Sequence, residues 1–178
     1  MSMARKIFSI VILLLVVAVV ILSLGLYSIN SLNSAMESLG RQAKRAVSLS
    51  NMDKLTLERR ITTSSIIESV DESQMKALMD KDMKDIEARM EGELKEYSAN
   101  FDNPPTQQQS AYLNGIRNNW NEYVRITNEI ANLSHENSNE KANQLNSGMY
   151  DFWETIDADL DKLARLVVET NDLEVYNI

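Results

Sequence analysis

Two adjacent arginines, Arg59 and Arg60, are the residues of this sequence best suited to binding chemistry. Arg60 follows Asp53 and Leu57 in helical steps of four and three, at a position where a packed helix carries an apolar residue. A guanidinium group there needs a carboxylate partner, because an unpaired buried charge is costly. The partner is either a ligand carboxylate, bound through two parallel hydrogen bonds, or an Asp or Glu of a neighbouring helix. As a third reading, the arginine extends to water.

The composition excludes most other chemistry. The chain has no cysteine and a single histidine, His135, which excludes thiolate sites, disulfides and a multi-histidine metal or haem site within one chain. The 18 Lys and Arg against 26 Asp and Glu give a net charge of −8, which argues against a nucleic-acid partner. We find no nucleophile–base pair and no phosphate-binding loop. We therefore expect no catalytic residues, no metal, no cofactor and no enzymatic activity.

An uncharged run over residues 7–27 predicts a transmembrane helix. Its 21 residues span about 32 Å as a helix, enough for a hydrocarbon core of about 30 Å. Arg5 and Lys6 precede it, so residues 1–6 are expected in the cytoplasm and residues 28–178 outside. A cleaved signal peptide is the alternative, although the run is longer than a typical signal h-region. The acidic, cysteine-free outer part favours a bacterial inner membrane with a periplasmic domain.

The outer part, residues 28–178, predicts four amphipathic helices with short connections. The second helix carries the most regular apolar pattern, from Met75 to Phe101 in steps of three and four. The connections are expected near Asp71, at Asp102–Pro105 and at Ser134–Asn139, where capping residues, prolines or polar runs occur. Four such helices imply an all-α, up-down-up-down antiparallel bundle that follows one N-terminal transmembrane helix.

Counting residues from the expected turns places several side chains at one height in this bundle. Arg60, Tyr123 and Tyr150 each lie 11 residues from a turn at the same end, or about 16 Å along the helices. A ligand site at this height is therefore expected to comprise six residues, Arg59, Arg60, Tyr123, Tyr150, Trp153 and Thr155. Two guanidinium groups favour a small carboxylate ligand, either an organic acid or an amino acid.

The order of these segments resembles the sensor region of a methyl-accepting chemotaxis receptor of the four-helix-bundle class. The stretches 113–133 (LNGIRNNWNEYVRITNEIANL) and 156–171 (IDADLDKLARLVVETN) are similar to the third and fourth helices of that family. The resemblance implies a transmembrane chemoreceptor that binds a periplasmic ligand through first-helix arginines and polar fourth-helix residues. Arg59 and Arg60 match the first group by height, and Tyr150 and Thr155 match the second loosely.

Several functions and partners remain open at this stage. The same bundle can serve as the sensor region of a histidine kinase or a diguanylate cyclase, and a non-enzymatic membrane adaptor is a further alternative. We expect a homodimer through the first helix, because its apolar positions near the membrane, such as Leu32, Met36 and Leu39, exceed what the shorter second and third helices can cover. We also expect that the fourth helix continues beyond Ile178 into a second membrane segment.

Overall fold

The computed structural model describes residues 3–69, 71–101, 104–136 and 138–175. Every regular element in this part of the chain is helical. In chain order they are α1 (Met3–Glu68), α2 (Glu72–Ala77), the π-helix η1 (Leu78–Met83), α3 (Lys84–Ala99), α4 (Gln107–His135), α5 (Asn139–Ser147) and α6 (Tyr150–Val175). Asp102 and Asn103, which we expected to start a connection, lie outside the described residues, as do residues 1–2 of the expected cytoplasmic tip.

The chain divides into two units, Met1–Gly40 and Arg41–Ile178. The first unit consists of the N-terminal part of α1. Among the described residues, one helix is long and apolar enough to cross a membrane, as judged by its length and composition alone, and it lies near the N-terminus. Its large apolar side chains, such as Leu22, Leu24 and Leu26, are exposed. This helix is therefore a candidate membrane span.

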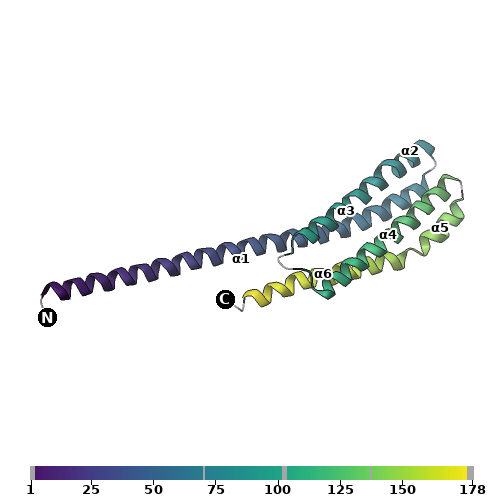
Figure 1. Ribbon diagram of the computed structural model, residues 1–178. Coiled ribbons are helices and arrows are strands. Elements are labelled where there is room, and N and C mark those ends of the chain that lie inside the picture. Colours follow the sequence, from purple (N-terminus) through teal and green to yellow (C-terminus); the bar gives the residue numbers. More distant parts are fainter. Residues whose placement is uncertain (1–2, 70, 102–103, 137, 176–178) are drawn as a thin grey trace. The chain divides into compact units, whose positions relative to one another are not determined.

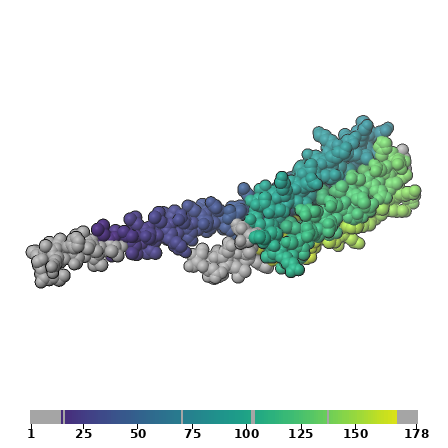
Figure 2. All heavy atoms as spheres, viewed as in Figure 1, coloured from purple at the N-terminus to yellow at the C-terminus, as the bar shows by residue number. Residues whose placement is uncertain are grey.

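The second unit is a bundle of four antiparallel helical runs, which confirms the all-α fold class. The runs are α1 from Arg41 onwards, α2–η1–α3, α4, and α5–α6 (Figure 1). Hydrogen bonds from Asn51 to Glu93 and from Arg89 to Glu58 fix the antiparallel register of α1 and α3. In the face that Figure 2 shows, the second run (teal) lies beside α4 (green).

Local capping explains where two of the runs begin. The Asp71 carboxylate accepts hydrogen bonds from the backbone N–H groups of Ser73 and Gln74, which satisfies donors that the first turn of α2 leaves open. Thr106 and Gln109 form a reciprocal capping box at the start of α4, as the sequence predicted. The starts of α2 and α4 therefore fall where the sequence placed them.

The core of the bundle is apolar along its length and is built from all four runs. Met52 and Leu55 of α1 are buried against Met90 and Tyr97 of α3 and the aromatic and aliphatic residues of α4 and α6. A smaller cluster of Ile66, Met75, Met83 and Ala131 forms separately. These methionines are thus core residues, in agreement with the apolar pattern of the second helix.

Two irregularities depart from the expected straight helices. The second run contains the π-helical turn η1, which follows from the burial of both Met75 and Met83. Eight residues overshoot two α-helical turns by about 80°, and the wider π turns reduce this offset. The fourth run is interrupted at Gly148, whose N–H donates to the Leu145 carbonyl oxygen at 3.0 Å. The poor helix formers Asn146, Ser147 and Gly148 explain this break.

Candidate functional site

A small cavity of about 110 Å³ lies between α1, α4 and the fourth run. It is lined by Arg60, Ser64, Tyr123, Asn146, Met149, Tyr150 and Trp153. Four of the six site residues that the sequence predicted therefore lie together: Arg60, Tyr123, Tyr150 and Trp153. Three separate runs contribute side chains, so the cavity forms only when the bundle is assembled.

Arg60 is the only charged side chain that lines this cavity. Its guanidinium carbon lies 5.3 Å from the centroid of the Trp153 ring and 6.0 Å from that of Tyr150. The two rings are themselves 5.6 Å apart. Cation–π contact with two rings orients the guanidinium group without using its N–H donors. Within the described part of the chain no hydrogen bond or ion pair is recorded for Arg60, so those donors remain available to a ligand.

Two further polar atoms of the lining are buried and have no partner. Among the described residues, the Tyr123 hydroxyl and the Trp153 indole nitrogen make no hydrogen bond. Burial raises the pKa of Tyr123 to about 12, against the opposing effect of the positive charges of Arg59 and Arg60. The phenol is therefore protonated at neutral pH and able to donate. Buried polar groups are normally satisfied, so these two atoms point to a ligand or to bound water.

The entrance of the cavity is more exposed. The side chain of Tyr150 is half exposed. A hydrogen bond to Glu154 raises the pKa of Tyr150, and the charge of that carboxylate acts in the same direction. Asn146 and Ser64 add groups that can both donate and accept hydrogen bonds. The lining as a whole offers more donors than acceptors and contains no carboxylate, which suits an anion.

Arg59 lies apart from this cavity and is fully buried. Its guanidinium group donates to Thr127 Oγ1 at 2.9 Å, to Asn128 Oδ1 at 2.9 Å and to the Met83 carbonyl oxygen at 2.9 Å. It also donates to Glu87 Oε1 at 2.7 Å. Burial lowers the pKa of Arg59, while the bond to Glu87 opposes this effect. Arg59 therefore joins α1 to the second run and to α4.

The expectation that Arg60 occupies the buried position of α1 is wrong, because Arg59 occupies it. Among the buried residues of α1, Met52, Leu55, Arg59, Thr63 and Ile66 follow one another in steps of three and four. Neighbouring helical residues point about 100° apart, so Arg60 emerges at the surface next to α6. The alternative in which a buried arginine pairs with a carboxylate of a neighbouring helix therefore describes Arg59 and Glu87.

Thr155 is not brought into the cavity. Its side chain is exposed, and its hydroxyl donates to the Asp151 carbonyl oxygen at 2.7 Å. Conversely, Ser64, Asn146 and Met149 line the cavity although the sequence did not predict them there. Ser64 lies one helical turn beyond Arg60, so counting residues from the turns could have placed it near the site. The placement of Asn146 and Met149 at the cavity depends on the helix break at Gly148, which a regular apolar pattern does not predict.

These features define a class of protein, a four-helix bundle with a small polar cavity between its helices. The chain belongs to the family described as the four helix bundle sensory module for signal transduction, whose family model matches residues 1–174. The resemblance to the sensor region of methyl-accepting chemotaxis receptors is thereby confirmed. No curated protein and no solved structure matches the chain.

Proposed function

We propose that this chain is the sensor region of a transmembrane chemotaxis receptor and that it binds a small organic anion in the cavity at Arg60. The observation that carries this proposal is the donor set of the cavity. Arg60, the Tyr123 hydroxyl and the Trp153 N–H come from three different helical runs, and no carboxylate lines the same space. Charge-assisted bonds from such donors to a carboxylate are short and strong.

The size and lining of the cavity favour an organic acid over an amino acid. About 110 Å³ is small compared with typical ligand pockets of roughly 300–1,000 Å³, so the ligand has only a few heavy atoms. An amino acid would also place an ammonium group in a cavity whose single charge is the positive charge of Arg60. A short carboxylate avoids that repulsion.

The elements around the cavity support a route for the signal. Arg60 lies on α1, which also contains the candidate membrane span, and Trp153 lies on α6. A ligand bonded to both helices favours the arrangement in which they hold it best, and so biases a small displacement of α6 against α1. Under this proposal the protein is a bacterial inner-membrane receptor without enzymatic activity of its own.

The exposed apolar residues of α1 support a homodimer. Leu32, Met36 and Leu39 are exposed in the first unit, and Val47, Leu57 and Ile61 are exposed in the second. A parallel copy of α1 is the simplest cover for such a face. The adaptor function remains the alternative, because the same exposed apolar face would also suit a different protein partner. A histidine kinase or diguanylate cyclase output remains compatible with the same sensor bundle.

Binding can be tested on the full chain in lipid nanodiscs. Thermal unfolding is measured with acetate, pyruvate, succinate and aspartate, for the wild type and for Arg60→Ala. We expect a short carboxylate to raise the melting temperature of the wild type and Arg60→Ala to lose most of this increase. Arg125→Ala is the matched control, because Arg125 is an exposed arginine of α4 that pairs with Glu122 and Glu129 away from the cavity. Equal responses of both variants would contradict the proposal.

A further inference from the structure

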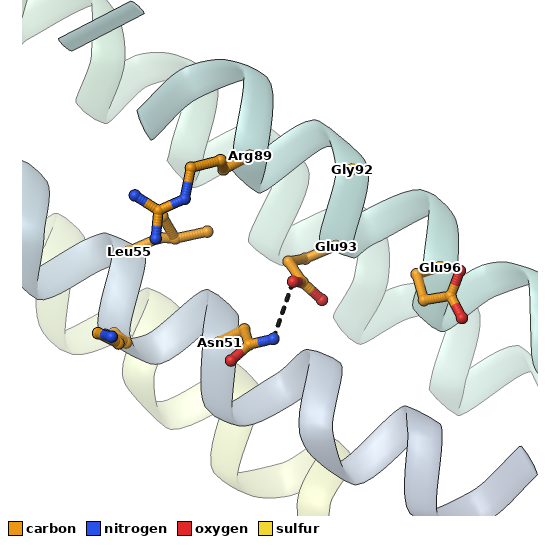
Figure 3. A pocket seen from close by; sticks show the side chains of 7 residues that line it. Asn51, Leu55, Arg89, Gly92, Glu93 and Glu96 are labelled. Atoms are coloured by element: carbon orange, nitrogen blue, oxygen red, sulfur yellow. Dashed lines mark hydrogen bonds between the residues drawn. The ribbon is translucent and has the colours of Figure 1, made fainter. Parts of the chain in front are cut away.

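A second cavity, of about 470 Å³, lies between α1 and α3 and shares no residue with the cavity at Arg60. Its lining consists of Asn51, Lys54, Leu55, Arg89, Gly92, Glu93 and Glu96. Figure 3 shows Arg89 toward one end of this space, Glu96 toward the other, and Asn51 bonded to Glu93 between them. The volume falls in the range of pockets that bind small molecules.

The charges of this second cavity are separated by sign along its length. Arg89 and Glu96 lie seven residues apart on α3, which is about 10 Å along the helix. Lys54 follows Asn51 by three residues on α1. Since α1 and α3 are antiparallel, Lys54 lies on the Arg89 side of the bond between Asn51 and Glu93. Lys54 and Arg89 thus lie toward one end of the cavity, where Arg89 is also paired with Glu58 and Asp85, and Glu96 lies toward the other end, with Glu93 between them.

Each charged group of this cavity keeps some capacity for a ligand. In the described part of the chain no ion pair is recorded for Lys54, and Arg89 forms its bonds to Glu58 and Asp85 through Nη1 alone. Glu93 accepts the Asn51 amide through Oε1, and Glu96 accepts the Asn100 amide through Oε1. Among the described residues, the second oxygen of each carboxylate accepts no hydrogen bond.

The cavity also has an apolar wall and open space. Leu55 is buried and lies beside Arg89, whereas the hydrogen bond between Asn51 and Glu93 lies in the middle. Gly92 lies within α3, and a Cβ atom added there would meet no atom within 4 Å. No neighbour inside the chain therefore requires a glycine at this position, although glycine is unfavourable within a helix. Its lack of a side chain leaves room for a group from outside the chain.

We propose that this second cavity binds a linear zwitterion, in which a short methylene chain joins an ammonium group to a carboxylate. The carboxylate lies at Lys54 and Arg89, the methylenes lie over Leu55, and the ammonium group lies at Glu93 and Glu96. Ion-pair contacts of about 3 Å at each end leave about 4 Å between the charges of the ligand, and 5-aminopentanoate, whose charges lie about 6 Å apart when extended, reaches this separation when its flexible chain bends. The charges of an α-amino acid are closer together than this, so it bridges the two ends poorly.

The proposal is tested with 5-aminopentanoate as the probe and the full chain in nanodiscs. Calorimetric titration compares 5-aminopentanoate with pentanoate and pentylamine, which each carry one of the two charges, and with glycine, in which they are too close. We expect 5-aminopentanoate to bind at least tenfold more tightly than any of the other three. Equal affinities, or no binding of 5-aminopentanoate, would overturn the proposal.

Substitutions at the second cavity test whether 5-aminopentanoate binds there. Gly92→Leu places an apolar side chain at the cavity, where its Cβ atom has no neighbour within 4 Å, and we expect it to weaken 5-aminopentanoate binding at least tenfold. Glu91→Leu is the control, because Glu91 is exposed on the same helix and does not line the cavity. Lys54→Gln, at an exposed position, should also weaken binding. Unchanged affinity in both Gly92→Leu and Lys54→Gln would refute the site, whereas Arg60→Ala should leave this binding intact even if the function proposed for the other cavity fails.

Discussion

Arg59 and Arg60 are consecutive residues of α1 with opposite environments. Arg59 is fully buried and donates hydrogen bonds to the second run and to α4, whereas Arg60 is exposed and lies over the ring of Trp153. The 100° between neighbouring helical positions separates a residue that holds the bundle together from one that is free to meet a ligand. The two arginines should therefore respond to substitution in different ways.

Arg59→Ala should destabilise the protein by about 2–4 kcal/mol, because it leaves the buried hydrogen-bond acceptors of its neighbours unsatisfied. Glu87 is the most affected, since it loses its ion-pair partner while its side chain remains two-thirds buried. Arg60→Ala should cost less than about 1 kcal/mol, the value of an exposed cation–π contact. Urea unfolding of the two variants measures the difference. Equal losses of stability would contradict the structural role of Arg59.

The fold could be predicted from the sequence because its signals are local and repeated. The apolar steps of the second helix, the capping residues Asp71 and Thr106, and the polar connection after Leu133 each indicate a boundary by themselves. Which residues of α1 face the core was harder to predict from the sequence. Leu57 belongs to the spacing from which Arg60 was expected to be buried, yet Leu57 is exposed, as is Ile61, because this helix has a second apolar face.

The sequence predicted the level of the candidate site along the bundle but not which side chains point into it. Tyr123, Tyr150 and Trp153 reach one cavity because residues equally far from the turns of an antiparallel bundle share a level. The direction of each side chain depends on its angular position around the helix, and this position places Thr155 at the surface. The break at Gly148 changes the phase of the fourth run, and a regular 3.6-residue pattern cannot anticipate it.

Tyr123→Phe should separate binding from stability. The substitution removes a buried hydroxyl that has no partner among the described residues, so the free protein should lose no stability and can gain up to about 1 kcal/mol. It also removes a donor from the cavity, so the affinity for a short carboxylate should fall by about 1 kcal/mol or more. Urea unfolding and calorimetric titration measure the two effects. A large loss of stability would instead indicate a hydroxyl satisfied by water.

Asp157→Asn should stabilise the protein at neutral pH. Burial raises the pKa of Asp157, and the nearby carboxylates of Asp53 and Asp161, a hydrogen bond with Asp53 and the charge of Glu154 act in the same direction. A raised pKa in the folded state means that protonated Asp157 contributes stability, which is present at low pH and is lost as the pH rises through that pKa. The variant should therefore gain up to about 1 kcal/mol at pH 7 and nothing below about pH 4.

The measurement for Asp157→Asn is urea unfolding at both pH values. Asp151→Asn serves as its control, because Asp151 is an exposed residue in the first turn of α6. A carboxylate near a helix N-terminus is stabilising, so the control should lose a little stability at pH 7 and the two variants should differ in sign. A gain for Asp157→Asn that persists at pH 4 would show that the ionisation of Asp157 is not its cause.

Single cysteines test the proposed dimer directly, because the chain has none of its own. Leu39→Cys and Ile61→Cys place a thiol on the exposed apolar positions of α1, and Leu55→Cys places one in the core. If two parallel copies of α1 face each other, equivalent residues approach across the symmetry axis within disulfide range, with Cα atoms about 4.4–6.8 Å apart. Oxidation in membranes should then crosslink the Leu39→Cys and Ile61→Cys chains and leave the Leu55→Cys chain monomeric on a non-reducing gel. A failure of both exposed positions to crosslink, with free thiols accessible to a maleimide, would favour a different protein partner on this face and so the adaptor function.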